Sequence, residues 1–171
     1  GGIFVDCTFG GGSFSKALLE FEKTKVIGID RDPAVISIAN QLKKKYRSRF
    51  EFNKLKFSQL DNILSSEVDA FVFDLGLSSI QLNDLKRGFS FKSRDSLDMN
   101  MGLADKSAQE VVNTLSEEKL KLILKIFGDE REASKIAKNI VKARIEKKIT
   151  KVDELVRIIE KSKKKNFSTK I

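Results

Sequence analysis

A glycine turn directly after a short apolar run most constrains what this chain can fold into. Residues 2–5 predict a buried strand, residues 10–12 are glycines, and a helical pattern begins at Ser13. Gly10 and Gly12 lack a Cβ, so the backbone can turn tightly there and approach a ligand, while the following helix offers unpaired N–H groups. A strand, a glycine turn and a helix in this order predict a site for a nucleotide-like ligand.

A second strand, predicted at residues 25–29, ends in Asp30. A carboxylate about 20 positions after the glycine turn can accept both hydroxyls of a ribose. Asp6 precedes the glycines by four positions, a spacing typical of S-adenosylmethionine sites, where the carboxylate or a water it holds reaches the methionine ammonium. A dinucleotide site stays open, because Ser15 is small enough for the last position of Gly-x-Gly-x-x-Gly. A glycine turn without a ligand also stays open.

The first hundred residues alternate strand and helix patterns, which predicts a parallel α/β sheet. The expected strands are residues 3–5, 26–29, 50–53 and 70–73. The expected helices are residues 13–20 and 33–46, with Asp32 as the N-cap of the second, and a shorter crossover at residues 58–64. Four strands rarely complete a doubly wound sheet, so we expect a fragment whose first domain is incomplete.

The pattern changes after the fourth strand. Residues 1–103 form the expected α/β domain, with a long loop at residues 75–102, and residues 104–162 form a small helical domain. Capping boxes are predicted at residues 107–110 and 150–153, and Gly128 is predicted to cap one of the helices. Residues 163–171 are predicted to be a basic tail or linker.

Composition narrows the possible chemistry and partners. One cysteine and no histidine exclude internal disulfides and histidine-based nucleophile activation, and no metal site is predicted. The sequence shows neither a signal peptide nor an apolar run of membrane-spanning length, so a cytoplasmic protein without a membrane partner is expected. Residues 103–171 hold 18 Lys and Arg against 11 Asp and Glu. This surplus of 7 favours a polyanion partner, with a merely Lys-rich solvated surface as the alternative.

Asp74 is the candidate catalytic residue. It directly follows the fourth strand, so it is expected at the carboxyl edge of the sheet, where ligands bind. Methylation of an exocyclic amine needs an acceptor for an N–H near the sulfonium methyl, and a carboxylate supplies one without a histidine base. A helix cap or a loop ion pair is the alternative role of Asp74.

Together, five blocks of the sequence resemble the bacterial 16S ribosomal RNA cytosine-N4 methyltransferases of the MraW or RsmH type. The blocks are DCTFGGG at residues 6–12, DRDP at 30–33, DLGLSSIQL at 74–82, RGFSF at 87–91 and LDMNM at 97–101. The resemblance covers nearly the whole chain. It implies a Rossmann-like S-adenosylmethionine-dependent methyltransferase domain, here without its closing strands, and a small all-α inserted domain. It also implies a cytosine in the decoding region of small-subunit RNA as the methyl acceptor.

The resemblance also implies which residues contact the cofactor. These are Gly12, Ser13, Phe14, Asp30, Phe57, Asp74 and Gln81, which join Asp6 and Gly10 in the expected site. Phe57 would offer an apolar surface to adenine, and Gln81 a polar contact. The chain departs from the family where Ser13-Phe14 replaces Gly-His, where Cys7 replaces a common glycine, where Arg94-Asp95-Ser96 replaces Asp-Gly-Pro and where Asn100 replaces Arg.

The expected RNA contacts lie in the second half of the chain. Arg87, Phe89 and Phe91 are expected to hold an unstacked cytosine, and Lys163, Lys164 and Lys165 to contact phosphates. The expected partner is small-subunit ribosomal RNA or the assembled subunit, and a homodimer is possible. Three alternatives remain: a methyltransferase of another amine on DNA or protein, a non-catalytic RNA-binding module, and a nicotinamide-dependent oxidoreductase, for which no hydride-transfer partner is visible.

Overall fold

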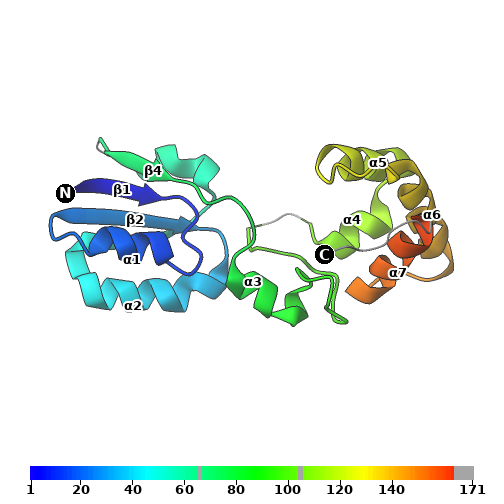
Figure 1. Cartoon of the computed structure of the whole chain (residues 1–171), viewed down its shortest axis with the longest axis horizontal. Helices are drawn as coiled ribbons and strands as arrows, with labels where there is room; N and C mark the ends of the chain where they lie inside the picture. The colour runs from blue at the N-terminus through cyan, green and yellow to red at the C-terminus, as the bar shows by residue number, and fades with distance from the viewer. Residues whose placement is uncertain (65–66, 104–105, 164–171) are drawn as a thin grey trace, which may run out of the picture. The chain divides into compact units, whose positions relative to one another are not determined.

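The chain folds into two compact units, which are described separately. The computed structural model describes residues 1–64, 67–103 and 106–163. The α/β unit is built from Gly1–Asn83 and the described residues from Met101, and the helical unit from Asp84–Asn100 and the described residues from Lys106 (Figure 1). None of the helices in these ranges has the length and apolar composition that crossing a lipid bilayer requires.

The α/β unit contains a four-stranded parallel sheet, which confirms the predicted fold class. Its strands are β1 (Gly2–Asp6), β2 (Thr24–Asp30), β3 (Phe50–Lys54) and β4 (Ala70–Val72). The strand order is β3-β2-β1-β4, and each of the three pairings is parallel. Because β1, β2 and β4 are parallel neighbours, the segments that follow these three strands leave the same edge of the sheet.

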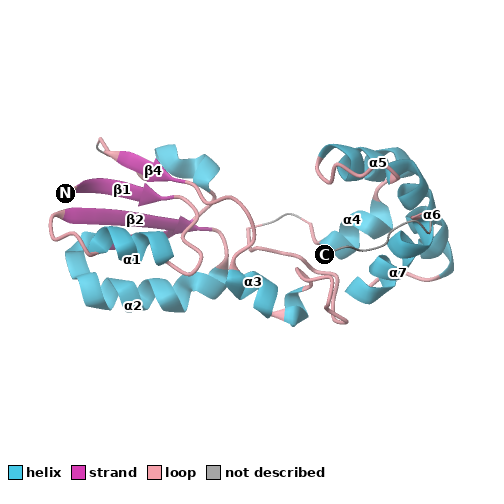
Figure 2. Cartoon of the chain, in the orientation of Figure 1, coloured by secondary structure: helices cyan, strands magenta, loops and turns pink. Residues whose placement is uncertain are grey.

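Side chains cover both faces of the sheet. Figure 2 shows α1 (Ser13–Leu19) and α2 (Ile36–Tyr46) on the same side of the strands, where Phe9, Leu19, Val26, Val35, Ala39, Leu42 and Phe50 form an apolar cluster. On the other face Val5, Cys7 and Ile29 pack against apolar residues of the segment between β3 and β4. Alternation explains this division, since successive side chains of a strand point to opposite faces.

Short 3-10 turns replace parts of the expected helices. The turn η1 (Pro33–Val35) precedes α2, and the Asp32 carboxylate accepts a hydrogen bond from the Ala34 N–H at 3.0 Å, which confirms Asp32 as an N-cap. The turn η2 (Arg47–Arg49) follows α2. The expected crossover at residues 58–64 is the 3-10 turn η3 (Phe57–Asn62).

The helical unit packs four helices around one apolar core. These are α4 (Ala108–Thr114), α5 (Glu117–Ile126), α6 (Ala133–Glu146) and α7 (Val152–Ser162). The core consists of Leu97, Val112, Leu120, Ile136, Ala137, Ile140, Ile149 and Val152. Leu97 comes from the loop that was expected to belong to the α/β domain, and its neighbour Ser96 pairs with Lys151. Burial of Leu97 explains why the structure groups Asp84–Asn100 with the helices, a division that differs from the expected boundary.

Along the sequence, two short elements lie between β4 and α4. Helix α3 (Ser79–Asn83) is the last element of the first α/β segment, and the 3-10 turn η4 (Leu85–Arg87) opens the helical unit. Residues 75–102 otherwise contain no long regular element, as the sequence predicted.

The helix ends confirm one predicted cap and correct another. The Ser107 hydroxyl accepts from the Glu110 N–H at 3.1 Å, as expected. The box expected at residues 150–153 is wrong, because the Glu154 carboxylate accepts from the N–H groups of Thr150 and Lys151 at 2.9 and 3.1 Å. Glutamate has the longer side chain and reaches both donors. At Gly128 a Cβ would lie 2.8 Å from a backbone oxygen of α5, while the left-handed conformation falls on Asp129 (φ 45°).

Candidate functional site

A cavity of about 510 Å³ opens within the α/β unit at the carboxyl ends of β1, β2 and β4. This volume lies in the usual range for sites of small molecules and cofactors. The glycine turn, the end of β2 and the segments after β3 and β4 each contribute to the lining. Of the predicted cofactor residues, the lining includes Gly10, Ser13, Phe14, Asp30, Phe57, Asp74 and Gln81. The topology therefore brings together residues that are far apart in the sequence.

The glycine turn has the geometry that its composition predicts. Gly10 and Gly12 adopt left-handed conformations, with φ of 48° and 73°. A Cβ on Gly12 would also lie 2.8 Å from the ring of Phe9. Gly12 is buried as the N-cap of α1 and does not line the cavity, so its role in this structure is to let the turn close.

The buried carboxylate of Asp6 connects the end of β1 to the first turn of α1. Its side chain has no exposed surface, and Asp6 is not part of the cavity lining. Oδ2 accepts hydrogen bonds from the hydroxyl and the backbone N–H of Ser15 at 2.7 and 3.2 Å. Burial raises the pKa of Asp6, although the bonds from Ser15 act in the opposite direction. Only Oδ2 makes these bonds, while Oδ1 is buried without a hydrogen-bond partner among the described residues, so the expected contact of Asp6 with the methionine ammonium, directly or through a water, stays a prediction.

Asp30 has a double role. Its Oδ2 accepts from the Gly10 N–H at 2.8 Å and its Oδ1 from the Asp32 N–H at 2.9 Å, while the residue also lines the cavity. A carboxylate oxygen has two lone pairs, so each of these oxygens can still accept from a ribose hydroxyl. Asp30 therefore shapes the glycine turn and remains placed for a ligand.

Asp74 is the exposed carboxylate of the site. It lines the cavity, and within the described ranges its carboxylate makes no hydrogen bond and no ion pair. Its backbone N–H donates to the Thr8 hydroxyl at 2.8 Å, which ties the segment after β4 to the glycine turn. In the described part of the chain the side chain neither caps a helix nor joins an ion pair, so the geometry favours a ligand-directed role. Thr8 was missed as a site residue, although it stands inside the DCTFGGG block.

The remaining predicted cofactor residues differ in exposure. Phe14 and Phe57 are nearly half exposed at the cavity, and the Phe57 ring meets Phe73 edge-on at 5.7 Å. Gln81 is buried, and its amide bonds to Asp32 and Ser78 within the protein. The bond between Gln81 and Asp32 was not predicted, because a sequence does not show which side chain a buried amide will meet.

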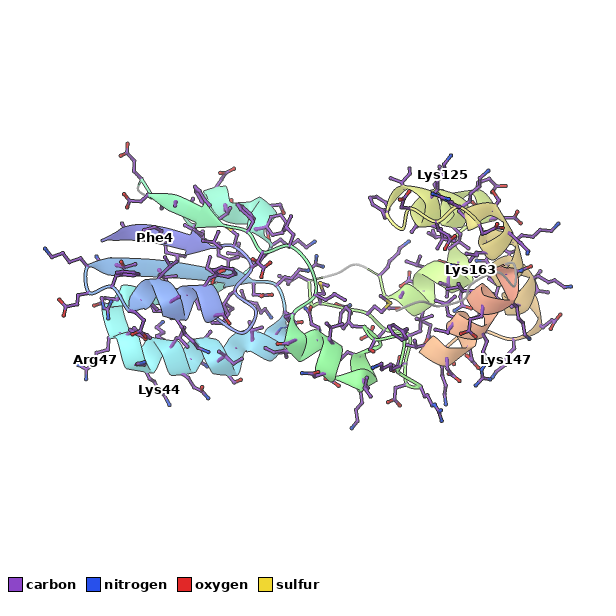
Figure 3. The ribbon with its side chains drawn as sticks, in the orientation of Figure 1. Phe4, Lys44, Arg47, Lys125, Lys147 and Lys163 are labelled. Atoms are coloured by element: carbon purple, nitrogen blue, oxygen red, sulfur yellow. The ribbon has the colours of Figure 1, made fainter. Side chains whose placement is uncertain are left out.

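Of the predicted substrate residues, Arg87, Phe89, Phe91 and Lys163 belong to the helical unit. Phe89 is buried, with the Arg87 guanidinium 5.2 Å from its ring centre, while Phe91 is 77% exposed. Lys163 forms an ion pair with Glu130 at 2.8 Å, and this contact lowers the pKa of Glu130. Figure 3 shows the extended side chains of Lys125 and Lys147 on this unit. Lys164 and Lys165 lie outside the described residues.

Comparison with known proteins identifies the family. The model of the MraW methylase family matches residues 1–170. The chain belongs to the MraW methylase family. This family uses S-adenosylmethionine as its methyl donor. The open glycine turn, the placement of Asp30 and the size of the cavity fit that molecule.

Two curated relatives carry the name ribosomal RNA small subunit methyltransferase H. The protein from Orientia tsutsugamushi (strain Ikeda) is 45% identical over 161 residues, which are 93% of this chain and 52% of that protein. The protein from Maricaulis maris is 40% identical over 166 residues, 95% of this chain and 50% of its own length. The chain thus spans about half the length of these relatives. A solved structure, a putative rRNA-methylase from Clostridium thermocellum, aligns with 45% of this chain and 44% of its own at 23% identity and a TM-score of 0.41.

Proposed function

We propose that the protein with this chain transfers a methyl group from S-adenosylmethionine to the exocyclic N4 of a cytosine in the decoding region of 16S ribosomal RNA. The observation that carries the proposal is the Asp74 carboxylate at the cavity, which is exposed and has no hydrogen bond or ion pair with any described residue. The family membership and the names of the relatives support the methyl donor and a ribosomal RNA substrate.

The chemistry that Asp74 supports is the positioning of an amine. When bound, S-adenosylmethionine supplies a methyl group already activated by a sulfonium. The Asp74 carboxylate would accept an N–H of the cytosine amine and turn its lone pair toward that methyl. A nitrogen–carbon bond forms as the carbon–sulfur bond breaks, and the amine then releases one proton, which Asp74 can receive or pass to water. No histidine is needed for this sequence of events.

The RNA would contact the helical unit, including residues 84–100 of the long loop. Residues 103–171 carry a surplus of 7 positive charges, which favours phosphate contacts. A base inside a helix cannot present its amine to a cofactor cavity, so the target cytosine must be unstacked, and the exposed Phe91 offers a ring for stacking. Reaction on ribosomal RNA implies a cytoplasmic protein, and the possible homodimer stays a prediction.

The test is methyl transfer with mapping of the product. The full-length protein would be incubated with labelled S-adenosylmethionine and, in parallel, with small-subunit RNA, assembled subunits, DNA and unrelated protein. We expect label on one cytosine of the small-subunit RNA, and N4-methylcytosine after digestion. Label on DNA or protein would identify a methyltransferase of another amine. Binding of RNA without binding of S-adenosylmethionine would instead identify an RNA-binding module.

A further inference from the structure

A buried hydrogen bond beside the cavity joins Asp32 and Gln81. Gln81 Nε2 donates to Asp32 Oδ2 at 2.8 Å, across 49 positions of sequence, and the two residues are 1% and 6% exposed. Asp32 follows β2, and Gln81 lies on α3 after β4. Since β2 and β4 flank β1, the bond connects the segments on both sides of the strand that leads into the glycine turn.

The orientation of the Gln81 amide is determined by its neighbours. Oε1 accepts from the Ser78 N–H at 3.0 Å, and the Ser78 hydroxyl accepts from the Gln81 N–H at 3.3 Å. These reciprocal bonds form a capping box at the start of α3. A backbone N–H only donates and a carboxylate only accepts, so the amide oxygen must face Ser78 and the nitrogen must face Asp32.

The segment between β4 and α3 is held mainly at its two ends. Residues 74–78 line the cavity, yet Leu75 and Leu77 are 72% and 41% exposed, so burial holds these side chains only weakly. At its start the Asp74 N–H bonds to Thr8. At its end Ser78 bonds to Gln81, which bonds to Asp32. Asp32 itself does not line the cavity.

We propose that Asp32 is a positioning residue of the cofactor site. Through Gln81 it holds residues 74–78, and with them the Asp74 carboxylate, at the edge of the cavity. The identity of the ligand rests on the proposed function, whereas the positioning of this segment is a property of the α/β unit alone.

A reciprocal exchange tests the pair. Asp32→Asn places an NH₂ group against the NH₂ group of Gln81, and Gln81→Glu places a carboxylate against the carboxylate of Asp32. In the double variant the new amide at position 32 donates to the new carboxylate at position 81. That carboxylate still accepts from Ser78, and the new amide oxygen still accepts from Ala34. The exchange therefore keeps each of these bonds, reverses the direction of one and moves the carboxylate from position 32 to position 81.

Two measurements report on positioning rather than on turnover. Each single variant should raise the Kd of S-adenosylmethionine roughly tenfold, the scale of a lost hydrogen bond to a charged group. Hydrogen exchange at the backbone N–H groups of residues 75–78 should become faster without any ligand. The double variant should return the Kd to within about threefold of the parent, since compensation in contacting pairs is a coupling effect.

Arg49→Gln is the matched control. Arg49 Nη1 donates to the carbonyls of Leu19, Phe21 and Thr24 near the amino ends of the strands, so its loss should lower the melting temperature without changing the Kd. If the single variants do not fold, Gln81→Met removes the bonds of the amide to Asp32 and Ser78 without changing the charge of either position.

Four outcomes decide the matter. Folded single variants that bind like the parent would overturn the proposal, and so would a double variant that melts like the parent but binds like the singles. Unfolding of Gln81→Met would show that the bond serves stability alone. If the parent did not bind S-adenosylmethionine while exchange in residues 75–78 still followed the pair, the proposed function would fail and the positioning role would stand.

Discussion

The two units of this chain use their partly buried polar side chains differently. In the helical unit the Asn113 amide bonds to the carbonyls of Gln109 and Ile149 and to the Ile149 N–H, and the Arg144 guanidinium bonds to two carbonyls at the end of α4. The contacts of Asn113 with Ile149 and of Arg144 with α4 join one helix or turn to another, while the contact with Gln109 lies within α4. In the α/β unit the side chains at the strand ends surround a cavity, and the fold uses them to different degrees.

The three strand-end carboxylates show this gradation. Asp6 is fully buried and bonded to α1, Asp30 is partly buried and bonded to the glycine turn, and Asp74 is exposed and unengaged among the described residues. A carboxylate that the backbone already uses is a poor candidate for chemistry. The comparison therefore favours Asp74 for the proposed chemistry and Asp30 as a residue shared between the turn and a ligand, while Asp6 is engaged with α1 through one of its two oxygens.

The largest effect is expected at Asp74. Asp74→Ala should lower the rate of methyl transfer by about a hundredfold or more, within the range for a positioned proton acceptor, while the fold stays intact. Asp74→Asn should keep part of the rate, because an amide oxygen still accepts an N–H. Rates would be measured at saturating S-adenosylmethionine, with the Kd measured alongside. A normal rate in Asp74→Ala would contradict the assignment.

The next effect concerns the shared residue. Asp30→Ala should weaken S-adenosylmethionine binding by about 1.5 to 3 kcal/mol, the range for hydrogen bonds to a charged group. It should also lower the melting temperature, since the Gly10 N–H loses its acceptor. Calorimetry measures the loss of affinity, and thermal melting measures the loss of stability. Unchanged affinity in a folded variant would mean that Asp30 supports the glycine turn and does not contact the ligand.

The helical unit should respond in stability alone. Asn113→Ala leaves the Ile149 N–H and carbonyl without their amide partner, which should cost about 1 to 3 kcal/mol of unfolding free energy. Denaturant titration of the full-length protein measures this loss, and the Kd of S-adenosylmethionine serves as the control. A changed Kd would show that the two units are coupled, and the comparison between them would then break down.

The sequence predicted most of the fold because its signals are local. Short apolar runs between helical patterns identified the four strands of the described sheet, and Asp32 before Pro33 identified a helix start. The boundary of the helical unit was not predictable in this way. It depends on the burial of Leu97 in a core whose other residues lie well over ten positions away in the sequence. Apolar spacing in residues 84–100 carries no information about which unit will bury them.

The sequence predicted several of the residues that line the site but not the hydrogen bonds among them. Strand ends and family motifs placed Asp30, Phe57, Asp74 and Gln81 around one cavity. The partners of Asp6 and Gln81 could not be read from the chain, since Ser15 and Asp32 meet them only after the sheet and helices have packed. Those partners decide whether a polar residue faces a ligand or the protein.

Acid should weaken the helical unit through Glu154. Its contact with Lys147, followed by the Thr150 N–H, lowers the pKa of Glu154 from an ordinary 4.5 to about 2. The carboxylate therefore stabilises the folded state fully above pH 4.5, and this contribution is lost as the pH falls toward about 2. Glu154→Gln should melt at a temperature that depends less on pH in this window. Glu146→Gln, which changes an exposed side chain of α6, is the control and should keep the parent's pH dependence.

The smallest effect is expected from Lys163, Lys164 and Lys165, and it tests whether the surplus charge serves RNA. Lys163 pairs with Glu130, so Lys163→Gln should change RNA binding little and mainly release Glu130. Neutralising Lys164 and Lys165 together should flatten the salt dependence by a slope of roughly 0.7 per lost contact on single-stranded RNA. The matched control is Lys44→Gln with Arg47→Gln, which removes the same charge from the exposed end of α2 in the other unit (Figure 3). Equal slopes for the two double variants would mean that the lysines near the chain's end contribute only general charge, and the RNA site would then rest on the loop with Phe91.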